Sequence, residues 1–284
     1  MAPHLRRGKP ALWRVVTDIS NIPAEARSRI EADLSRIERD EGVRILFAVE
    51  SGSRAWGFPS PDSDFDVRFV YVRQLRDYLT VHPVRDVIEL PIEHPYDTNG
   101  WDIRKALGLL LKANPVLLEW LQSPIRYRWD AVAAEALMEL ARDVGGSAAA
   151  LHHYRALASR QWKTYLDGKA VVNLKKYFYA ARPALTLEWM KANPGRVAPM
   201  NWDDLLRGGL LDPALQDDLD ALRVLKSAAA EVGEGERRPR VDAFIRDAMA
   251  WAEEAARGVP RRRTDLSGRA DALLARIVQG LPPG

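Results

Sequence analysis

The chain contains no cysteine. Disulfide frameworks and metal sites built from thiolates are therefore excluded. Long apolar runs are also missing, since no stretch approaches the roughly 20 residues that a membrane-spanning helix needs. The first residues are followed by no apolar core of signal-peptide length. We therefore expect a cytoplasmic protein with no membrane partner.

An excess of charge of one sign is absent as well. Lysine and arginine together number 42 against 39 aspartates and glutamates, which gives a formal net charge of +3. So mild a balance permits nucleic-acid binding without demonstrating it. The hydrophobic share of 47% and the charged share of 29% are typical of a soluble globular protein. The 284 residues suffice for one large or two ordinary domains.

The first half of the chain alternates helical and strand patterns. A helical face that contains Ile30, Leu34 and Ile37 ends at Gly42. Apolar or alternating runs that indicate strands follow over residues 43–49, 64–72, 84–90 and 96–101. This mixture predicts a small mixed β-sheet domain with flanking helices over residues 1–144.

The second half is helical throughout. Gly145-Gly146-Ser147 is a flexible break between periodic segments. Helical patterns follow over residues 148–166, 171–192, 213–230, 241–257 and 266–277. We therefore predict an all-α helical domain over residues 148–284 behind the sheet domain, which is an α+β architecture.

The most informative stretch runs from Gly52 to Asp66. Asp64 and Asp66 are separated by one residue at the start of an apolar strand, so both side chains project from the same face, about 6.5 Å apart. Two such carboxylates repel each other unless a cation lies between them. A polar turn is the alternative, but Asp66 lies inside a run of phenylalanine and valine, where aspartate is disfavoured. We predict a site for Mg²⁺, which carboxylates and substrate phosphates hold together, with Mn²⁺ as the second choice.

A Gly-Ser turn precedes this strand. Gly52 can adopt backbone angles that direct N–H groups at an anion, and the Ser53 hydroxyl adds a further donor. These groups form a cradle for phosphate beside the proposed metal pair. Together the two features predict a nucleotide site.

The stretch from Gly52 to Asp66 resembles the pattern of the DNA polymerase β nucleotidyltransferase superfamily, in which Gly-Ser is followed by ten residues and then by Asp-x-Asp. The similarity extends to its RNA-repair-associated branch, which residues 97–107, 114–121 and 175–183 also resemble. The resemblance implies transfer of a nucleoside monophosphate from a nucleoside triphosphate to an acceptor hydroxyl, with loss of pyrophosphate and an RNA end as the acceptor. Asp64 and Asp66 would be catalytic and would bind the metal. The implied nucleotide contacts are Gly52, Ser53 and Arg54.

The same resemblance implies a third carboxylate from a neighbouring strand. Asp97 opens the short strand pattern at 96–101, and we predict it as the third catalytic and metal-binding residue. Asp102 directly precedes a helical run, where aspartate caps the helix by accepting a hydrogen bond from backbone N–H groups. Asp102 and Glu89 are the alternatives.

Two groups of cations are further candidates for nucleotide binding. Arg104 and Lys105 begin a helix, where positive charge opposes the helix dipole, so a phosphate role and a solvated first turn are equally open. The second group shares one face of a later helix and consists of Lys175, Lys176, Tyr179 and Arg182. Given the resemblance, we expect this face to grip a triphosphate and stack a base; the alternative is a solvated surface.

Two rival functions stay open. One is transfer of AMP to a protein side chain, as small antitoxin-like members of the superfamily perform it. The other is a non-catalytic module that binds a nucleotide or a partner, against which the intact Gly-Ser and both aspartates argue. The expected partners are a nucleoside triphosphate and RNA, while the residues fix neither the base, nor the acceptor, nor the oligomeric state.

Overall fold

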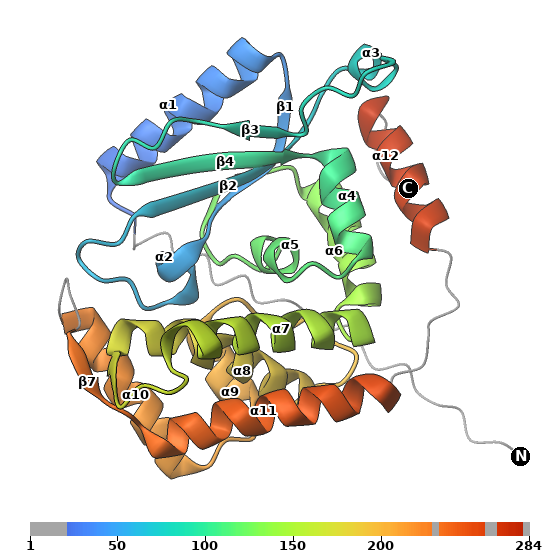
Figure 1. Cartoon of the computed structure of the whole chain (residues 1–284). Helices are drawn as coiled ribbons and strands as arrows, with labels where there is room; N and C mark the ends of the chain where they lie inside the picture. Colours follow the sequence, from blue (N-terminus) through green and yellow to red (C-terminus); the bar gives the residue numbers. More distant parts are fainter. Residues whose placement is uncertain (1–21, 229–232, 259–265, 281–284) are drawn as a thin grey trace, which may run out of the picture.

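A computed structural model gives the fold and describes residues 22–228, 233–258 and 266–280. Figure 1 shows two layers, in which a β-sheet with its covering helices lies above a layer of longer helices. The sheet has five strands in the order β3–β4–β2–β1–β5, and a separate pair joins β6 and β7. The predicted α+β class is therefore confirmed.

The five-stranded sheet is mixed. Its strands are β1 (Arg44–Glu50), β2 (Phe65–Val72), β3 (Val87–Glu89), β4 (Tyr96–Asp102) and β5 (Arg126–Trp129). β1 runs antiparallel to β2 and to β5, and β3 runs antiparallel to β4 at one edge. β2 and β4 are parallel neighbours, so their N-terminal ends lie side by side. This parallel pair carries the predicted carboxylates.

Helix α1 (Ala24–Glu41) covers one face of the sheet. Its buried residues include Ile30, Leu34 and Ile37, which recur every three or four positions and therefore lie on one side of the helix. They pack with the inward side chains of β1 and β2 in one apolar cluster. Gly42 ends the helix in the left-handed conformation, as its sequence position predicts.

The opposite face is covered by α4 (Ile103–Leu111), α5 (Pro115–Trp120) and α6 (Ala131–Val144). Their apolar side chains join Phe47 and Val70 of the sheet in a second cluster. The same cluster continues into the lower helices. The two layers therefore share one continuous apolar core.

The lower layer consists of α7 (Ala148–Tyr165), α8 (Leu174–Ala192), α9 (Trp202–Gly208), α10 (Pro213–Ala228) and α11 (Pro239–Gly258). α7 packs lengthwise along α8 and α11. The residues directly before α8 form β6 (Val171–Asn173), which pairs with β7 (Glu234–Glu236), whereas the sequence pattern placed the start of a helix at Val171. The β-branched pair Val171-Val172 favours the strand that the structure shows. Among the described helices, none is long and apolar enough to cross a membrane.

Helix α12 (Leu266–Val278) returns to the sheet layer and packs on α4 and α6 (Figure 1). Its buried residues Ala270, Leu273 and Ile277 have the spacing of one helix face. The sequence pattern therefore predicts the helix itself. Its position differs from our grouping, because periodicity shows that a helix buries one face but not which element covers that face.

Candidate active site

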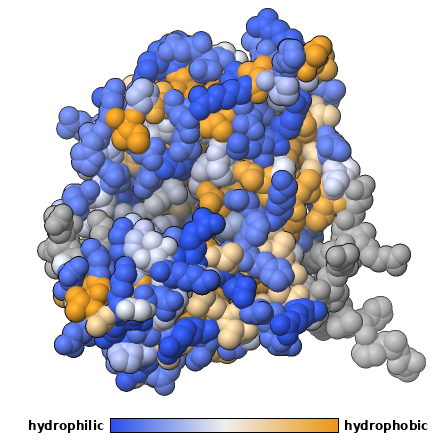
Figure 2. Space-filling view, viewed as in Figure 1, coloured by the Kyte–Doolittle hydropathy of each residue, from blue (hydrophilic) through white to orange (hydrophobic). Residues whose placement is uncertain are grey.

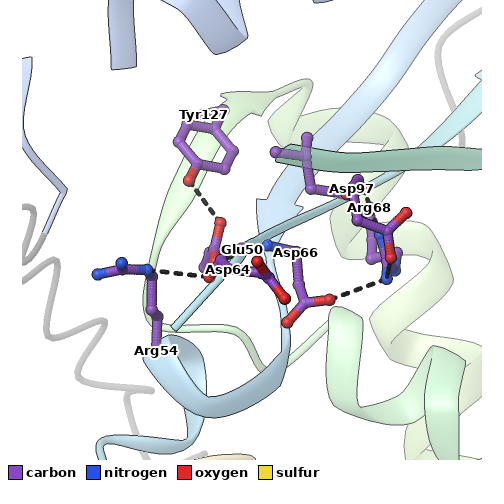
Figure 3. Close-up of polar contacts among 8 residues, drawn as sticks. Glu50, Arg54, Asp64, Asp66, Arg68, Asp97 and Tyr127 are labelled. Atoms are coloured by element: carbon purple, nitrogen blue, oxygen red, sulfur yellow. Dashed lines mark hydrogen bonds and ion pairs between the residues drawn. The ribbon is translucent and has the colours of Figure 1, made fainter. Parts of the chain in front are cut away.

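Two neighbouring strands bring the predicted carboxylates together (Figure 3). The register of the parallel strands β2 and β4 pairs Asp66 with Asp97. Neighbouring strands lie about 4.8 Å apart, and paired residues project from the same sheet face. Asp64 lies immediately before β2, two residues ahead of Asp66. Asp66 and Asp97 are therefore neighbours on one face, and Asp64 lies at the same end of the sheet.

Arg68 joins two of these carboxylates. Its Nη2 donates hydrogen bonds to Oδ1 of Asp66 at 3.0 Å and to Oδ2 of Asp97 at 2.7 Å, while Nη1 donates to the Asp97 carbonyl at 2.7 Å. Burial nevertheless raises the pKa of Asp66; Arg68 opposes the shift, and the negative charges of Asp97 and Asp64 add to it. The site therefore favours additional positive charge. Sequence reasoning missed Arg68, although its position two residues after Asp66 places it on the same strand face.

Glu50, the last residue of β1, lies fully buried behind Asp66. Its carboxylate accepts a hydrogen bond from the Asp66 backbone N–H at 2.9 Å and another from the Tyr127 hydroxyl at 2.5 Å. Burial raises the pKa of Glu50 to about 7. This buried carboxyl fixes the backbone from which the Asp66 side chain projects. The signal that could have found Glu50 is an acidic residue at the end of an otherwise apolar strand.

Gly52 opens the short helix α2 (Gly52–Trp56) in a left-handed conformation with φ of 57°. A Cβ atom at this position would lie 1.9 Å from Oδ2 of Asp66. Only glycine permits both the backbone angle and this close approach. The Gly-Ser turn is therefore fitted directly to the Asp66 carboxylate.

The carboxylates have the chemistry of a magnesium site, although Arg68 and a histidine now contact them. No convergent group of three or more His, Cys, Asp or Glu side chains occurs in the described part of the chain. Oδ1 of Asp64 lies 3.0 Å from Nδ1 of His94, and Arg68 occupies one oxygen of each of Asp66 and Asp97. Carboxylate oxygens are the ligands that Mg²⁺ prefers, so the donor chemistry of the aspartates suits this ion, and a metal site built from them is a proposal.

The lower layer adds aromatic rings and one cation beside the carboxylates. The ring of Tyr179 on α8 lies 6.4 Å from that of Tyr165 at the end of α7, and 6.3 Å from the Trp56 ring on α2. Lys176 Nζ lies 4.9 Å and 5.0 Å from the two tyrosine ring centroids. Burial raises the pKa of Tyr179, and the negative charge of Asp66 contributes to the shift. We call these four side chains the aromatic wall, and the negative charge of Asp66 reaches its Tyr179.

Comparison with known proteins agrees with this arrangement. Residues 26–276 match the sequence model of the RNA repair pathway DNA polymerase beta family. The chain belongs to this family. The protein YcgL of Bacillus subtilis (strain 168), itself described as uncharacterized, is 39% identical over 253 residues, which cover 89% of this chain and 96% of that protein. The resemblance that Gly-Ser and Asp-x-Asp indicate is thus confirmed, and the chain is a polymerase β-like nucleotidyltransferase.

Ser53 and Arg54 stabilise the loop that leads to β2 and its Asp66. The Ser53 hydroxyl donates to Oγ of Ser63 at 2.9 Å. Arg54 donates to the backbone carbonyls of Ser63 and Asp64 at 2.6 Å and 3.0 Å, and its guanidinium lies 4.1 Å from the centroid of the Phe65 ring. Both side chains hold the loop in place, and a direct nucleotide contact of either stays a prediction.

Arg182 is buried, whereas the sequence analysis expects it on a helix surface that faces the substrate. Only 3% of its side chain is exposed, and its Nη1 donates to Oε1 of Glu119 at 2.7 Å while Nη2 donates to the Met200 carbonyl at 2.7 Å. Its guanidinium also lies 4.6 Å from the centroid of the Trp56 ring. Helical spacing places Arg182 near the face of Tyr179, but α5 and the segment before α9 cover that part of α8. The interpretation of Arg182 as a nucleotide contact is therefore corrected, and the Lys175 side chain lies outside the described part of the chain.

Asp102 and Glu89 have structural partners. Asp102 caps α4, because its Oδ1 accepts from the Arg104 N–H at 2.7 Å and its Oδ2 accepts from the Tyr78 hydroxyl at 2.8 Å. Asp102 also lies five residues after Asp97 on an extended strand, about 16 Å away. Glu89, opposite Asn99 on the edge strand, is half exposed and pairs with Arg85. Of the three candidates for the third carboxylate, only Asp97 adjoins Asp66.

Arg104 and Lys105 lie at the far end of β4 from the carboxylates. The Arg104 guanidinium is 4.8 Å from the centroid of the Tyr78 ring, and Lys105 Nζ is 3.0 Å from Oδ1 of Asp86. Because β4 is fully extended, the helix that follows it begins a strand length away from Asp97. This position does not favour a nucleotide contact of Arg104 or Lys105, which stays a prediction.

Proposed function

We propose that the protein transfers a nucleoside monophosphate from a nucleoside triphosphate to an RNA end in a Mg²⁺-dependent reaction. The observation that carries this proposal is the pairing of Asp66 with Asp97 across two parallel strands, with Gly52 fitted against the Asp66 carboxylate. Family membership supports the reaction type and the connection with RNA repair.

Each side chain of the site has a part in this reaction. Asp64, Asp66 and Asp97 would hold Mg²⁺, which when bound would neutralise charge on the phosphates. Arg68 draws Asp66 and Asp97 towards one cation and offsets their repulsion. Glu50 holds the backbone of Asp66 in place.

The aromatic wall approaches Asp66 through Tyr179 and suits the remaining parts of a nucleotide. The Tyr179 ring offers an aromatic surface for the base, and Lys176 Nζ offers charge to a triphosphate. The acceptor hydroxyl attacks the α-phosphate in line and releases its proton to solvent, a bond from that oxygen to phosphorus forms, and the bond to the leaving pyrophosphate breaks. Catalysis then consists of positioning and charge stabilisation, and no protein nucleophile is needed.

The test is incubation of the protein with each α-labelled nucleoside triphosphate, Mg²⁺ and a pool of short RNAs, followed by separation of RNA from protein. Label should appear in RNA, should need the divalent ion, and should disappear with Asp66→Asn. Glu89→Gln is the matched control, because it removes an exposed carboxylate on the neighbouring edge strand and should leave the transfer unchanged. Label that stays with protein would support AMP transfer to a side chain instead. Equal labelling by wild type and Asp66→Asn would overturn the proposed site.

A further inference from the structure

The positive charge of the chain is concentrated in one helical hairpin. Residues 144–187 contain seven lysines and arginines and a single acidic residue, Asp167, a net charge of +6 in a chain whose total is only +3. The remainder of the chain is therefore net negative. Helix α7 contains no acidic residue at all. This segment, which we call the basic hairpin, includes α7, β6 and most of α8.

Some of these cations are engaged within the fold, and others face solvent. Arg182 is buried against Glu119, and Arg155 pairs with Glu253 at 2.6 Å. Arg160 and Lys163 are exposed on α7, and within the described ranges neither forms an ion pair. Lys169, in the loop after α7, is also exposed, and its Nζ donates to a backbone carbonyl at 3.1 Å. Among the side chains that the structure describes, Arg160, Lys163 and Lys169 are therefore available to an anionic ligand.

The basic hairpin leads to the carboxylates. α7 crosses the molecule below α2 and α5, and its last residue is Tyr165 of the aromatic wall (Figure 1). Figure 2 shows the surface indented between the two layers, with hydrophilic side chains along the lower one. Arg160 and Lys163 are three residues apart and therefore share one exposed face of α7. Tyr165 is the last residue of the same helix, two positions after Lys163, and its ring projects from a different face.

We propose that the RNA acceptor binds as a single strand along this hairpin. Its phosphates contact Arg160, Lys163 and Lys169, and a base near the reacting end stacks on Tyr165. Sites for single-stranded nucleic acid combine a positive track for the backbone with aromatic side chains for the bases, and the hairpin has both. This inference rests on the proposed function, because it names the surface that presents the acceptor to the carboxylates.

The physical signature of such a surface is its salt dependence. Neutralising one phosphate of a single strand contributes about 0.7 to the slope of log affinity against log salt. Arg160→Ala/Lys163→Ala should therefore lower the slope by roughly 1.4 and weaken binding about tenfold at low salt. Tyr165→Leu should weaken binding by a similar factor at every salt concentration, because stacking does not depend on released counterions.

The experiment measures fluorescence polarisation of a short labelled single-stranded RNA with the full chain between roughly 50 and 200 mM salt. It is done with chelator and without nucleotide, so that it reports RNA binding alone. Arg39→Ala/Arg76→Ala is the matched control, because both arginines are exposed on helices of the sheet layer, α1 and α3 (Leu75–Tyr78). Lys163→Glu is a second hairpin variant, and thermal unfolding shows that each variant is folded.

We expect the hairpin variants to bind RNA more weakly, and Arg160→Ala/Lys163→Ala to show a smaller dependence of log affinity on log salt. The control pair should bind RNA as wild type does. Wild-type affinity in the hairpin variants, or an equal loss in the control pair, would overturn the inference. Tighter binding of an acidic polypeptide than of RNA would also overturn it, in favour of a protein partner. Asp66→Asn should still bind RNA here although it loses transfer. If the wild-type protein binds RNA through the hairpin but transfers no nucleotide, the proposed reaction fails and the proposed surface stands.

Discussion

Replacing Arg182 with alanine should lower the stability of the fold without removing a direct contact to the nucleotide. The Arg182 side chain is 3% exposed and that of Glu119 is 11% exposed, and their atoms approach to 2.7 Å. Removal of one partner leaves the other charge buried and uncompensated, which costs about 3–5 kcal/mol of unfolding free energy. For a chain of this size, each kcal/mol lowers the melting temperature by roughly 2–4 °C. A fall of roughly 6–20 °C is therefore expected.

Thermal and urea unfolding of three variants measure this effect. Arg182→Ala should show the full loss, whereas Arg182→Met/Glu119→Met should recover most of it, because apolar side chains of similar volume replace buried ion pairs with little cost. Lys176→Ala, on the same helix but less buried, is the control and should change stability by no more than about 0.5 kcal/mol. A melting temperature unchanged in Arg182→Ala, together with weaker nucleotide binding, would refute the reasoning and restore Arg182 to the substrate site.

Three further predictions concern the site and its surroundings. Burial raises the pKa of Glu50 to about 7, against 4.5 for an ordinary carboxyl, so its contribution to stability is present below pH 4.5 and is lost as pH rises through 7. In metal-free buffer, the melting temperature of Glu50→Gln should therefore rise relative to that of wild type from about pH 5 to pH 8. A difference in melting temperature that stays constant over this range would contradict the prediction. Gly52→Ala should lower kcat about 100-fold by displacing Asp66, whereas Gly168→Ala, which has the same sign of φ but open space around it, should retain activity. Arg104→Ala/Lys105→Ala should bind nucleoside triphosphate with wild-type affinity in a titration, because both side chains lie at the far end of β4; a large loss would show that they reach the substrate.

Local patterns predicted the elements that carry the carboxylates. Alternation in the runs around Phe47 and Phe65 gave the central strands, and one-residue spacing placed Asp64 and Asp66 on one face. The helical run after Asp102 identified it as a cap, which the structure confirms. These features depend on neighbours within a few residues, so the sequence alone carries them.

Tertiary contacts decided the rest. Arg182 and Lys176 have equally plausible helical spacing with Tyr179, but only the packing of α5 against α8 shows that Arg182 is interior. Tyr165 approaches the site from a segment far from the aspartates in the sequence, and nothing local marks it as their neighbour. The packing of α12 on α4 and α6 could not be predicted from the sequence either, because an amphipathic pattern does not specify which element covers the apolar face.

The central claim is that Asp66 and Asp97 of neighbouring strands form one metal-dependent nucleotide site. Calorimetric titration of a nucleoside triphosphate with and without Mg²⁺ tests it most directly, in wild type, Asp66→Asn, Asp97→Asn and the control Glu89→Gln. The account predicts that Mg²⁺ strengthens binding to wild type and to the control, and that both aspartate variants lose this dependence. Metal-dependent binding that persists in Asp97→Asn while Glu89→Gln loses it would contradict the account.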